Sequence, residues 1–208
     1  MQTPDPSGPS TFWEQRYRGA EIEEVSWYEK APNLSLALLR MGGVEGVDGV
    51  IDVGGGASFL AQSLQEEGFG DLTVLDASGS ALEIARSRWA GSSSVEWIVA
   101  DLLQWSPTRR WRFWHDRAVF HFLTDGTDRA TYRNLLAASL GDEGIAVIAT
   151  FAEDGPTMCS GLEVARYRPE ELAAVFDRDF SSLAFGRYLH LTPSGVVQPL
   201  SWVVLRRR

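Results

Sequence analysis

The stretch that most constrains this chain lies at residues 49–60, where a short apolar run meets three consecutive glycines. The apolar run predicts a buried strand, and Gly54, Gly55 and Gly56 predict a tight turn after it. The residues that follow are spaced like one face of a helix, which Gly68 would end. Backbone without side chains can approach a ligand closely at a helix N-terminus. This unit therefore predicts a site for a nucleotide-type cofactor.

The rest of the chain alternates between strand and helix patterns. Further strands are expected at residues 72–76, 95–101, 112–119 and 144–151, followed by a closing pair at 180–192 and 198–206. Helices are expected at residues 33–41, from residue 80, at 125–140 and at 169–176. This alternation predicts a Rossmann-like three-layer α/β/α sandwich around a mostly parallel, seven-stranded sheet. The C-terminal hairpin would add an antiparallel strand to that sheet.

Length and composition bound the class of protein. At 208 residues the chain is most simply one domain, 1–208. A net charge of −9 argues against nucleic acid as a partner, because phosphate contacts need clustered Lys and Arg. The single cysteine, Cys159, argues against an internal disulfide and a cysteine-rich zinc site, so no metal is expected. No apolar stretch is long enough to cross a membrane, and a reducing cytoplasm is the expected location.

Residues 1–32 are expected to form an N-terminal arm, distinct from a cofactor-binding core at residues 45–208. The arm is rich in aromatic side chains, namely Phe12, Trp13, Tyr17, Trp27 and Tyr28. The first three suit a short helix, whereas residues 25–28 have an extended pattern. The arm is then either a flap that packs on the core or a lid over a cofactor and a substrate.

Acidic residues stand at or near the ends of four successive strands. They are Asp52, Asp76, Asp101 and Asp116. Ligands of open α/β sheets bind outside the carboxyl ends of the strands. One acid there means little, but several at successive strand ends indicate polar contacts to one extended ligand.

The glycine turn itself helps to discriminate between cofactors. A dinucleotide fingerprint requires a third glycine, which lets the helix pack closely on the strand. Gly54 and Gly56 fit that fingerprint, but Phe59 occupies the position of the third glycine, which counts against NAD. Asp76 would suit a ribose diol in either case.

These residues resemble the class I S-adenosylmethionine-dependent methyltransferases. The turn at residues 52–58 is similar to the family's glycine motif, with Ser58 in place of the last glycine. The resemblance implies that Asp52, Gly54, Gly55 and Gly56 hold the cofactor and that Asp76, with Ala77, binds the ribose. It further implies that Asp101 and Leu102 contact the adenine and that Asp116 lies below the methionine part. Trp27 of the arm is a further candidate cofactor-binding residue.

The resemblance extends to a subgroup. Residues 12–13, 25–28, 114–122 and 159–162 are similar to small bacterial members, some of them described as trans-aconitate methyltransferase-like. The overall layout is also similar to some small eukaryotic protein-lysine methyltransferases. The resemblance thus implies a reaction, methyl transfer from S-adenosylmethionine, but no particular acceptor.

Candidates for the acceptor side lie on loops after the fourth and fifth strands. A base is needed only if the acceptor carries a proton at neutral pH. His121 and Asp154 are candidate bases, and Arg166 and Tyr167 are candidate binders of an anionic or polar acceptor. Three of them have a structural alternative: His121 as a hydrogen-bonded histidine, Asp154 as a solvated acid and Arg166 in a surface ion pair. Cys159 is expected to be a buried small residue, and His190 either reaches the site or pins the hairpin.

Several functions remain open. The first hypothesis is a methyltransferase for a small molecule, such as a carboxylic acid, and the second is a protein methyltransferase. A cofactor-binding module without catalysis is a third, and a nicotinamide oxidoreductase is a distant fourth.

Overall fold

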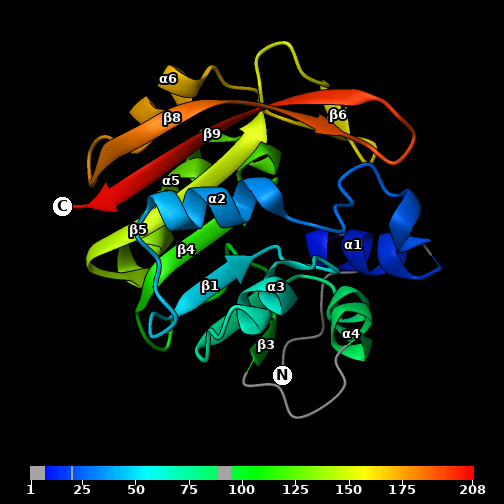
Figure 1. Cartoon of the computed structure of the whole chain (residues 1–208). Coiled ribbons are helices and arrows are strands. Elements are labelled where there is room, and N and C mark those ends of the chain that lie inside the picture. The colour runs from blue at the N-terminus through cyan, green and yellow to red at the C-terminus, as the bar shows by residue number, and fades with distance from the viewer. Residues whose placement is uncertain (1–7, 20, 89–94) are drawn as a thin grey trace.

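The computed structural model describes residues 8–19, 21–88 and 95–208. Its centre is a seven-stranded sheet with the order β3-β2-β1-β4-β5-β9-β8 (Figure 1). The strands are β1 (Val50–Val53), β2 (Leu72–Asp76), β3 (Val95–Val99), β4 (Trp111–Arg117), β5 (Leu140–Phe151), β8 (Phe180–Leu191) and β9 (Val197–Arg207). Strands β1 to β5 pair in parallel, and β9 is antiparallel to both of its neighbours. The predicted fold class is confirmed.

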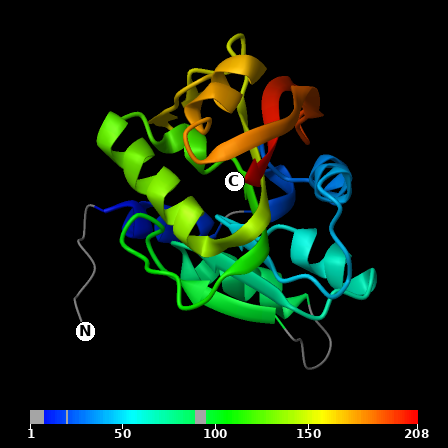
Figure 2. The same cartoon turned by 90° about the vertical axis from the view of Figure 1, so that its left-hand side faces the viewer.

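Helices cover both faces of this sheet, and Figure 2 shows the sheet between them. One face carries α2 (Asn33–Met41) and α3 (Leu60–Glu66), and the other carries α5 (Gly126–Ser139) and α6 (Pro169–Val175). Helix α4 (Gly79–Ser87) packs near the edge of the sheet, against β2 and β3. Helix α1 (Pro9–Tyr17) and the short 3-10 helix η1 (Ile22–Glu24) belong to the N-terminal arm.

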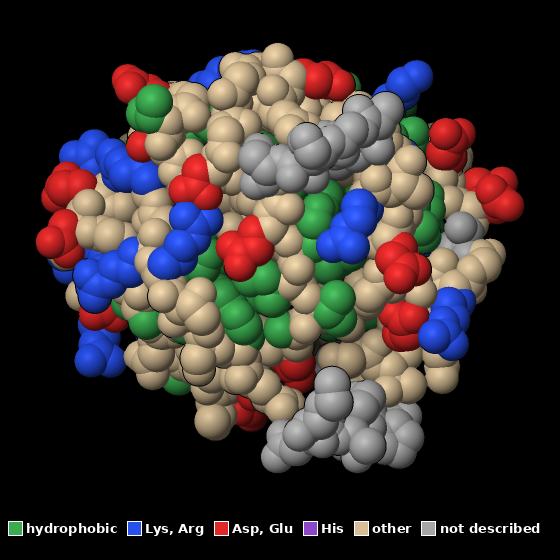
Figure 3. Space-filling model, turned by 90° about the horizontal axis from the view of Figure 1, so that it is seen from below, with side chains coloured by type: hydrophobic (Ala, Val, Ile, Leu, Met, Phe, Trp, Pro, Cys, Tyr) green, Lys and Arg blue, Asp and Glu red, His purple; other side chains and the backbone are tan. Residues whose placement is uncertain are grey.

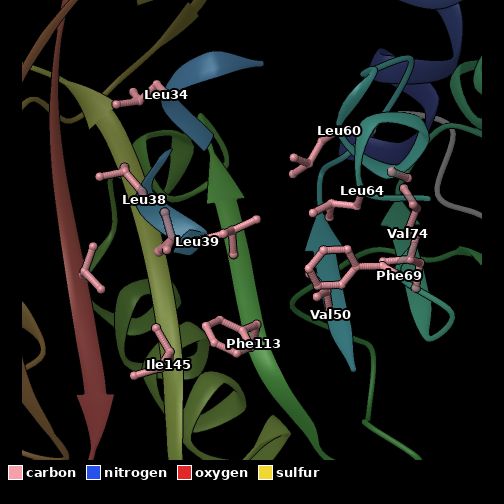
Figure 4. Packing of buried hydrophobic residues seen from close by; sticks show 14 of the residues in the cluster. Leu34, Leu38, Leu39, Val50, Leu60, Leu64, Phe69, Val74, Phe113 and Ile145 are labelled. Carbon is pink, nitrogen blue, oxygen red and sulfur yellow. The ribbon is translucent and has the colours of Figure 1, made fainter. Parts of the chain in front are cut away.

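Alternation along the buried strands divides the core into two layers. Val50 of β1 packs on the α2 and α3 side, whereas its neighbour Ile51 packs on the α5 and α6 side. Figure 4 shows the first layer, where Leu38 and Leu39 of α2 lie near Phe113 and Ile145 of the central strands. Because both faces of the central strands are buried, these strands cannot shift register without moving apolar side chains to the wrong layer.

The strand order reverses between β1 and β4, because β2 and β3 lie on one side of β1 and later strands on the other. A reversal of this kind leaves a crevice at the carboxyl ends of the strands. Helix α1 lies beyond the tip of β1, at that end of the sheet (Figure 1). The arm is therefore placed across the edge where a ligand is expected.

Some local predictions differ from the structure. Residues 25–28 form a bend and turn after η1 and not an extended segment. The long loop after β5 contains a small hairpin, β6 (Met158–Cys159) and β7 (Leu162–Glu163), whose tip Ser160 and Gly161 have positive φ angles. Strand β4 ends at Arg117 and not at residue 119, because the next residue, Ala118, has a φ of 74°. A hairpin whose strands have two residues each, and a single irregular backbone angle, leave no periodic signal in a sequence.

Figure 3 views the molecule from below the orientation of Figure 1 and shows acidic and basic side chains interspersed around a hydrophobic centre. Strand β3 is an edge strand of the sheet, and its Val99 is exposed. Within the described residues, none of the helices combines the length and the apolar character needed to cross a membrane.

Candidate functional site

The glycine turn after β1 requires glycine on steric grounds. Gly54 has a φ of +62°, and a Cβ atom there would lie 2.0 Å from Val119 Cγ2. Gly56 has a φ of +48°, and its Cβ would lie 2.6 Å from the hydroxyl oxygen of Tyr17. Both angles lie in the left-handed region, which residues with side chains rarely adopt. The turn therefore keeps its backbone bare between the strand ends and the arm.

A buried chain of hydrogen bonds supports the turn from below. Parallel pairing of β1 and β4 places Asp52 opposite His115. His115 Nδ1 lies 2.7 Å from Asp52 Oδ1, and its Nε2 lies 2.8 Å from Ser35 Oγ of α2. With a proton on Nδ1, the ring donates to the carboxylate and accepts from the serine hydroxyl. This arrangement fixes the position of the Asp52 carboxylate through two other elements.

The acid at the end of β2 is also buried. Asp76 Oδ1 accepts a hydrogen bond of 2.8 Å from the backbone N–H of Ser78. Burial raises the pKa of Asp76 to about 7, and the charge of Asp52 adds to that effect, although backbone N–H donors from Ser78 and Gly56 oppose it. A carboxyl group with such a pKa changes charge near neutral pH.

Asp101 and Leu102 follow β3 and form a turn of their own. Asp101 Oδ1 accepts from the N–H of Leu103 at 3.0 Å, and Oδ2 accepts from the Gln104 side chain at 3.2 Å. Leu102 is buried. The turn holds both side chains next to the ends of β1 and β2, because β3 and β2 pair in parallel.

A cavity of about 610 Å³ joins these groups. Of the residues predicted to bind a cofactor, eight line it: Trp27, Asp52, Gly54, Gly55, Asp76, Ala77, Asp101 and Leu102. Gly56 and Asp116 are not among the residues that line it. Asp116 lies fully buried behind it, where its carboxylate accepts from Tyr132 Oη at 2.6 Å and from the N–H groups of Val119 and Phe120. Burial raises its pKa to about 6. Asp116 therefore holds the backbone of the turn that follows β4, at Val119 and Phe120.

The N-terminal arm covers part of the cavity on the outside, and a carboxylate that sequence reasoning missed holds it there. Glu14 of α1 accepts from Ser78 Oγ at 2.9 Å, from Ser80 N–H at 3.1 Å and from Ser80 Oγ at 2.5 Å. These hydrogen bonds, led by that from the Ser80 hydroxyl, lower the pKa of Glu14 to about 2. Behind this contact, Trp27 Nε1 donates to Tyr17 Oη at 3.3 Å.

The four candidate residues for the acceptor side do not line this cavity. His121 is fully buried between the rings of Phe122 and Phe151, and neither ring nitrogen has a hydrogen-bond partner among the described residues. Burial, with a smaller contribution from the nearby Arg117 charge, lowers its pKa to about 3. His121 is therefore neutral at physiological pH and lines a separate small cavity of about 20 Å³.

The other three candidates make contacts elsewhere. Asp154 pairs with Arg187 of β8 at 2.5 Å. Arg166 Nη1 donates to the carbonyl oxygens of Glu153 and Gly155, at 2.9 and 3.1 Å, and so ties together the loop after β5. Tyr167 packs its ring against Phe120, with 5.8 Å between the centroids.

A second group that the sequence did not reveal anchors the arm to the core. Glu29 Oε1 lies 3.1 Å from Arg117 Nη2 at the end of β4 and 3.0 Å from His190 Nδ1 of β8. Arg117 Nη1 also donates to the carbonyl oxygen of Trp27 at 3.0 Å, and His190 Nε2 lies 2.7 Å from the carbonyl oxygen of Ser26. His190 therefore pins the arm, and not the hairpin to which it belongs.

Comparison with known proteins places this geometry in context. Residues 50–140 match the family model described as a methyltransferase domain. A comparison with curated proteins finds no match. Among solved structures, an S-adenosylmethionine-dependent methyltransferase from Anabaena variabilis has a TM-score of 0.75 at 19% identity, with 100% of this chain and 98% of that chain covered.

Two further solved structures show the same fold. The N-methyltransferase NodS from Bradyrhizobium japonicum, in complex with S-adenosyl-L-homocysteine, has a TM-score of 0.69 at 16% identity, with 96% of this chain and 99% of that chain covered. The 1,6-didemethyltoxoflavin-N1-methyltransferase from Burkholderia thailandensis has a TM-score of 0.71 at 18% identity, with 100% and 92% covered. The matched segment 50–140 contains the glycine turn and the ends of β1 to β4, so the match to a methyltransferase domain and the fold together support a methyltransferase that uses S-adenosylmethionine as methyl donor.

Proposed function

We propose that this chain is an S-adenosylmethionine-dependent methyltransferase that acts on a small molecule. The observation that carries the proposal is the cavity of about 610 Å³, which runs from the glycine turn to the β6–β7 hairpin under the arm. Its volume is within the usual range for small-molecule sites. In this proposal residues 1–208 act as one domain, residues 45–208 hold the cofactor, and the described part of the arm at residues 1–32 covers it; residues 1–7, 20 and 89–94 lie outside the described residues.

The described residues fit the proposed cofactor. The turn at Gly54 and Gly55 leaves bare backbone in the cavity wall, where a side chain at Gly54 would overlap Val119. Asp76 would accept hydrogen bonds from the ribose hydroxyls, and Asp101 with Leu102 would contact the adenine. Asp116 would act as a positioning residue through the backbone of Val119 and Phe120. When bound, S-adenosylmethionine supplies a methyl group on a positively charged sulfur.

The role of this chain's own residues is to hold the acceptor in line and to exclude water, because the donor is already activated. The buried chain of Ser35, His115 and Asp52 fixes one wall of the site. The arm, held by Glu14 and by Glu29, covers the other side. A cavity that the arm covers in part favours a small acceptor over a protein side chain, which would have to enter beneath the arm while the rest of its protein stayed outside.

One of the related structures also favours a small-molecule acceptor. One of them is described as an N-methyltransferase for 1,6-didemethyltoxoflavin, with that small molecule and S-adenosylhomocysteine bound. The acceptor of the present chain is a separate question, because identities below 20% carry the fold and not the substrate.

The proposal is tested by binding and turnover measured together. Calorimetry should detect S-adenosylhomocysteine binding, and Asp76→Ala should weaken it by about 1–3 kcal/mol, because ribose hydroxyls would lose their partner. Label from methyl-labelled S-adenosylmethionine should then appear in the small-metabolite fraction of a cell extract and not in its protein. Label in protein alone would establish a protein methyltransferase, and binding without any labelled product would indicate a module that only binds the cofactor. Binding of NADH in preference to S-adenosylhomocysteine would contradict the proposal.

A further inference from the structure

The charges that line the large cavity are strongly unbalanced. Six carboxylates and one guanidinium, that of Arg117, belong to its described lining residues. The carboxylates belong to Glu29, Asp52, Asp76, Asp101, Asp128 and Glu163. A cavity lined by one sign of charge concentrates its field on any ligand inside it. This field opposes the entry of an anionic acceptor.

The guanidinium offsets only the charge of Glu29, with which Nη2 pairs, and so leaves five of the six carboxylates. Arg117 Nη1 donates to the Trp27 carbonyl oxygen, and Nε is buried without a hydrogen-bond partner among the described residues. Two further arginines near the loop after β5 are also committed, since Arg166 binds backbone carbonyls and Arg187 binds Glu153 and Asp154. The described part of the chain therefore offers an anionic acceptor no free cation in this cavity.

Two of the carboxylates belong to neither the proposed cofactor contacts nor the ion pair with Arg117. Asp128 comes from the first turn of α5, and Glu163 from β7 of the small hairpin. Neither forms an ion pair with any described residue. Asp128 is half-buried and Glu163 is exposed, so both can meet a ligand without a large desolvation cost.

The remaining wall is aromatic. Trp13 of α1 packs edge to face against Phe122 at 5.2 Å and against Trp27 at 6.1 Å, measured between ring centroids. All three rings line the cavity, with Leu162 and Cys159 nearby in the small hairpin. Aromatic walls bind flat apolar groups, and their faces also attract cations.

We propose that the acceptor is an amine carried on an aromatic or otherwise apolar frame. This inference rests on the proposed function and adds the substrate class to it. The amine binds as an ammonium ion and first loses one proton to solvent at the partly exposed end of the cavity near Asp128 and Glu163. The lone pair of the neutral nitrogen then forms the new N–C bond, and the bond between the methyl carbon and sulfur breaks with its electron pair on sulfur. The product keeps one positive charge as the methylated ammonium ion, and His121, which does not line the cavity, takes no part in this step.

The first test is binding to the protein loaded with S-adenosylhomocysteine. The probes are benzylamine, benzyl alcohol and phenylacetate, which share a ring and differ mainly in the polar group. Benzylamine should bind at least about tenfold more tightly than phenylacetate. Glu163→Gln and Asp128→Asn should each weaken benzylamine binding about three- to fivefold, as expected for a partly exposed charge pair. Glu170→Gln, an exposed site on α6 outside the cavity, serves as the matched control and should change nothing. Equal or tighter binding of phenylacetate would overturn the inference.

The second test identifies the product. Cell extract treated with enzyme and methyl-labelled S-adenosylmethionine is separated on cation and anion exchangers. Label should elute with the basic metabolites, and Glu163→Gln should raise the KM for the labelled acceptor while S-adenosylhomocysteine affinity stays unchanged. Label in the anionic fraction would refute the amine and leave the proposed methyltransferase in place. If the wild-type protein neither binds S-adenosylhomocysteine nor transfers label, the proposed function is refuted, and the inference with it.

Discussion

Glu14 provides the sharpest test of whether the arm acts as a lid. Its carboxylate accepts three hydrogen bonds from Ser78 and Ser80, at the start of α4, and so ties α1 across the cavity. Replacement by alanine removes all three. Glu14→Gln removes the charge and keeps most of the shape. We expect the arm to open more often in both variants, and more often in the alanine variant.

The size of the effect follows from the contacts. A hydrogen bond to a charged group contributes about 1.5–3 kcal/mol when it is shielded from water. The Glu14 side chain is 27% exposed, and the serine groups can bond to water once the arm lifts, so the sum of three such bonds is too large. A net loss of about 2 kcal/mol corresponds to an opening equilibrium about 30-fold more favourable.

Hydrogen exchange measured by mass spectrometry on the peptide covering residues 9–17 reports this opening directly. Exchange should be faster by about that factor, and S-adenosylhomocysteine should dissociate faster by a similar factor in stopped-flow measurements. Glu23→Ala changes the same charge on an exposed part of the same arm and should leave both rates unchanged. Unchanged exchange and dissociation in Glu14→Ala would refute the latch.

The latch also has a definite pH dependence. The pKa of Glu14 is lowered from 4.5 to about 2 by its serine donors. The stabilisation is therefore complete above about pH 4.5 and is lost as pH falls toward 2. Protection of residues 9–17 should stay constant between pH 6 and 8, where a contact that depended on a histidine would change.

Three further predictions follow from single residues. Asp76→Asn should gain in melting temperature relative to the wild type as pH rises from 4 to 7 and then level off. The reason is that the native pKa of about 7 makes the buried carboxylate destabilising above the unfolded value of 3.8. Gly54→Ala should lower the free energy of unfolding in urea by about 2 kcal/mol or more, because its Cβ would overlap Val119, and Val119→Ala should restore part of it. His121→Phe should raise the melting temperature, and more so below pH 6.5, because the native pKa of about 3 makes the wild type lose stability as pH falls toward 3.

The fold was largely predictable because its signals are local. Strands β1 and β2 are short runs that are mostly apolar, and helices α2 and α4 each have an apolar stripe. Gly54 and Asp76 could be singled out for the same reason, since the turn directly follows β1 and the acid is the last residue of β2. The small hairpin of β6 and β7 was missed because strands of two residues have no measurable period.

The contacts of the arm were not predictable, because they join residues far apart in the chain. Glu14 meets Ser78 and Ser80 across 64 and 66 positions, and His190 meets Glu29 across 161. Nothing in the local sequence distinguishes these residues from other surface acids and histidines. The same limit applies to Arg166. Its charge and its place in the loop after β5 predicted that it binds an anion, but its guanidinium donates to backbone carbonyl oxygens.

The two ends of the cavity differ in how they are built. Each residue proposed to hold the donor lies at the end of its own strand or within a few positions after it, so strand pairing alone brings these residues together. The acceptor end instead combines the arm, the end of β4, the start of α5 and a hairpin, which supply Trp13, Arg117, Asp128 and Glu163. None of these segments determines the position of another through regular pairing. Substitutions there alter which molecule fits while the strand ends that face the donor stay in place. A chain of this design can therefore keep its methyl donor and change its acceptor, and the acceptor has to be inferred from charge and shape at this end of the cavity.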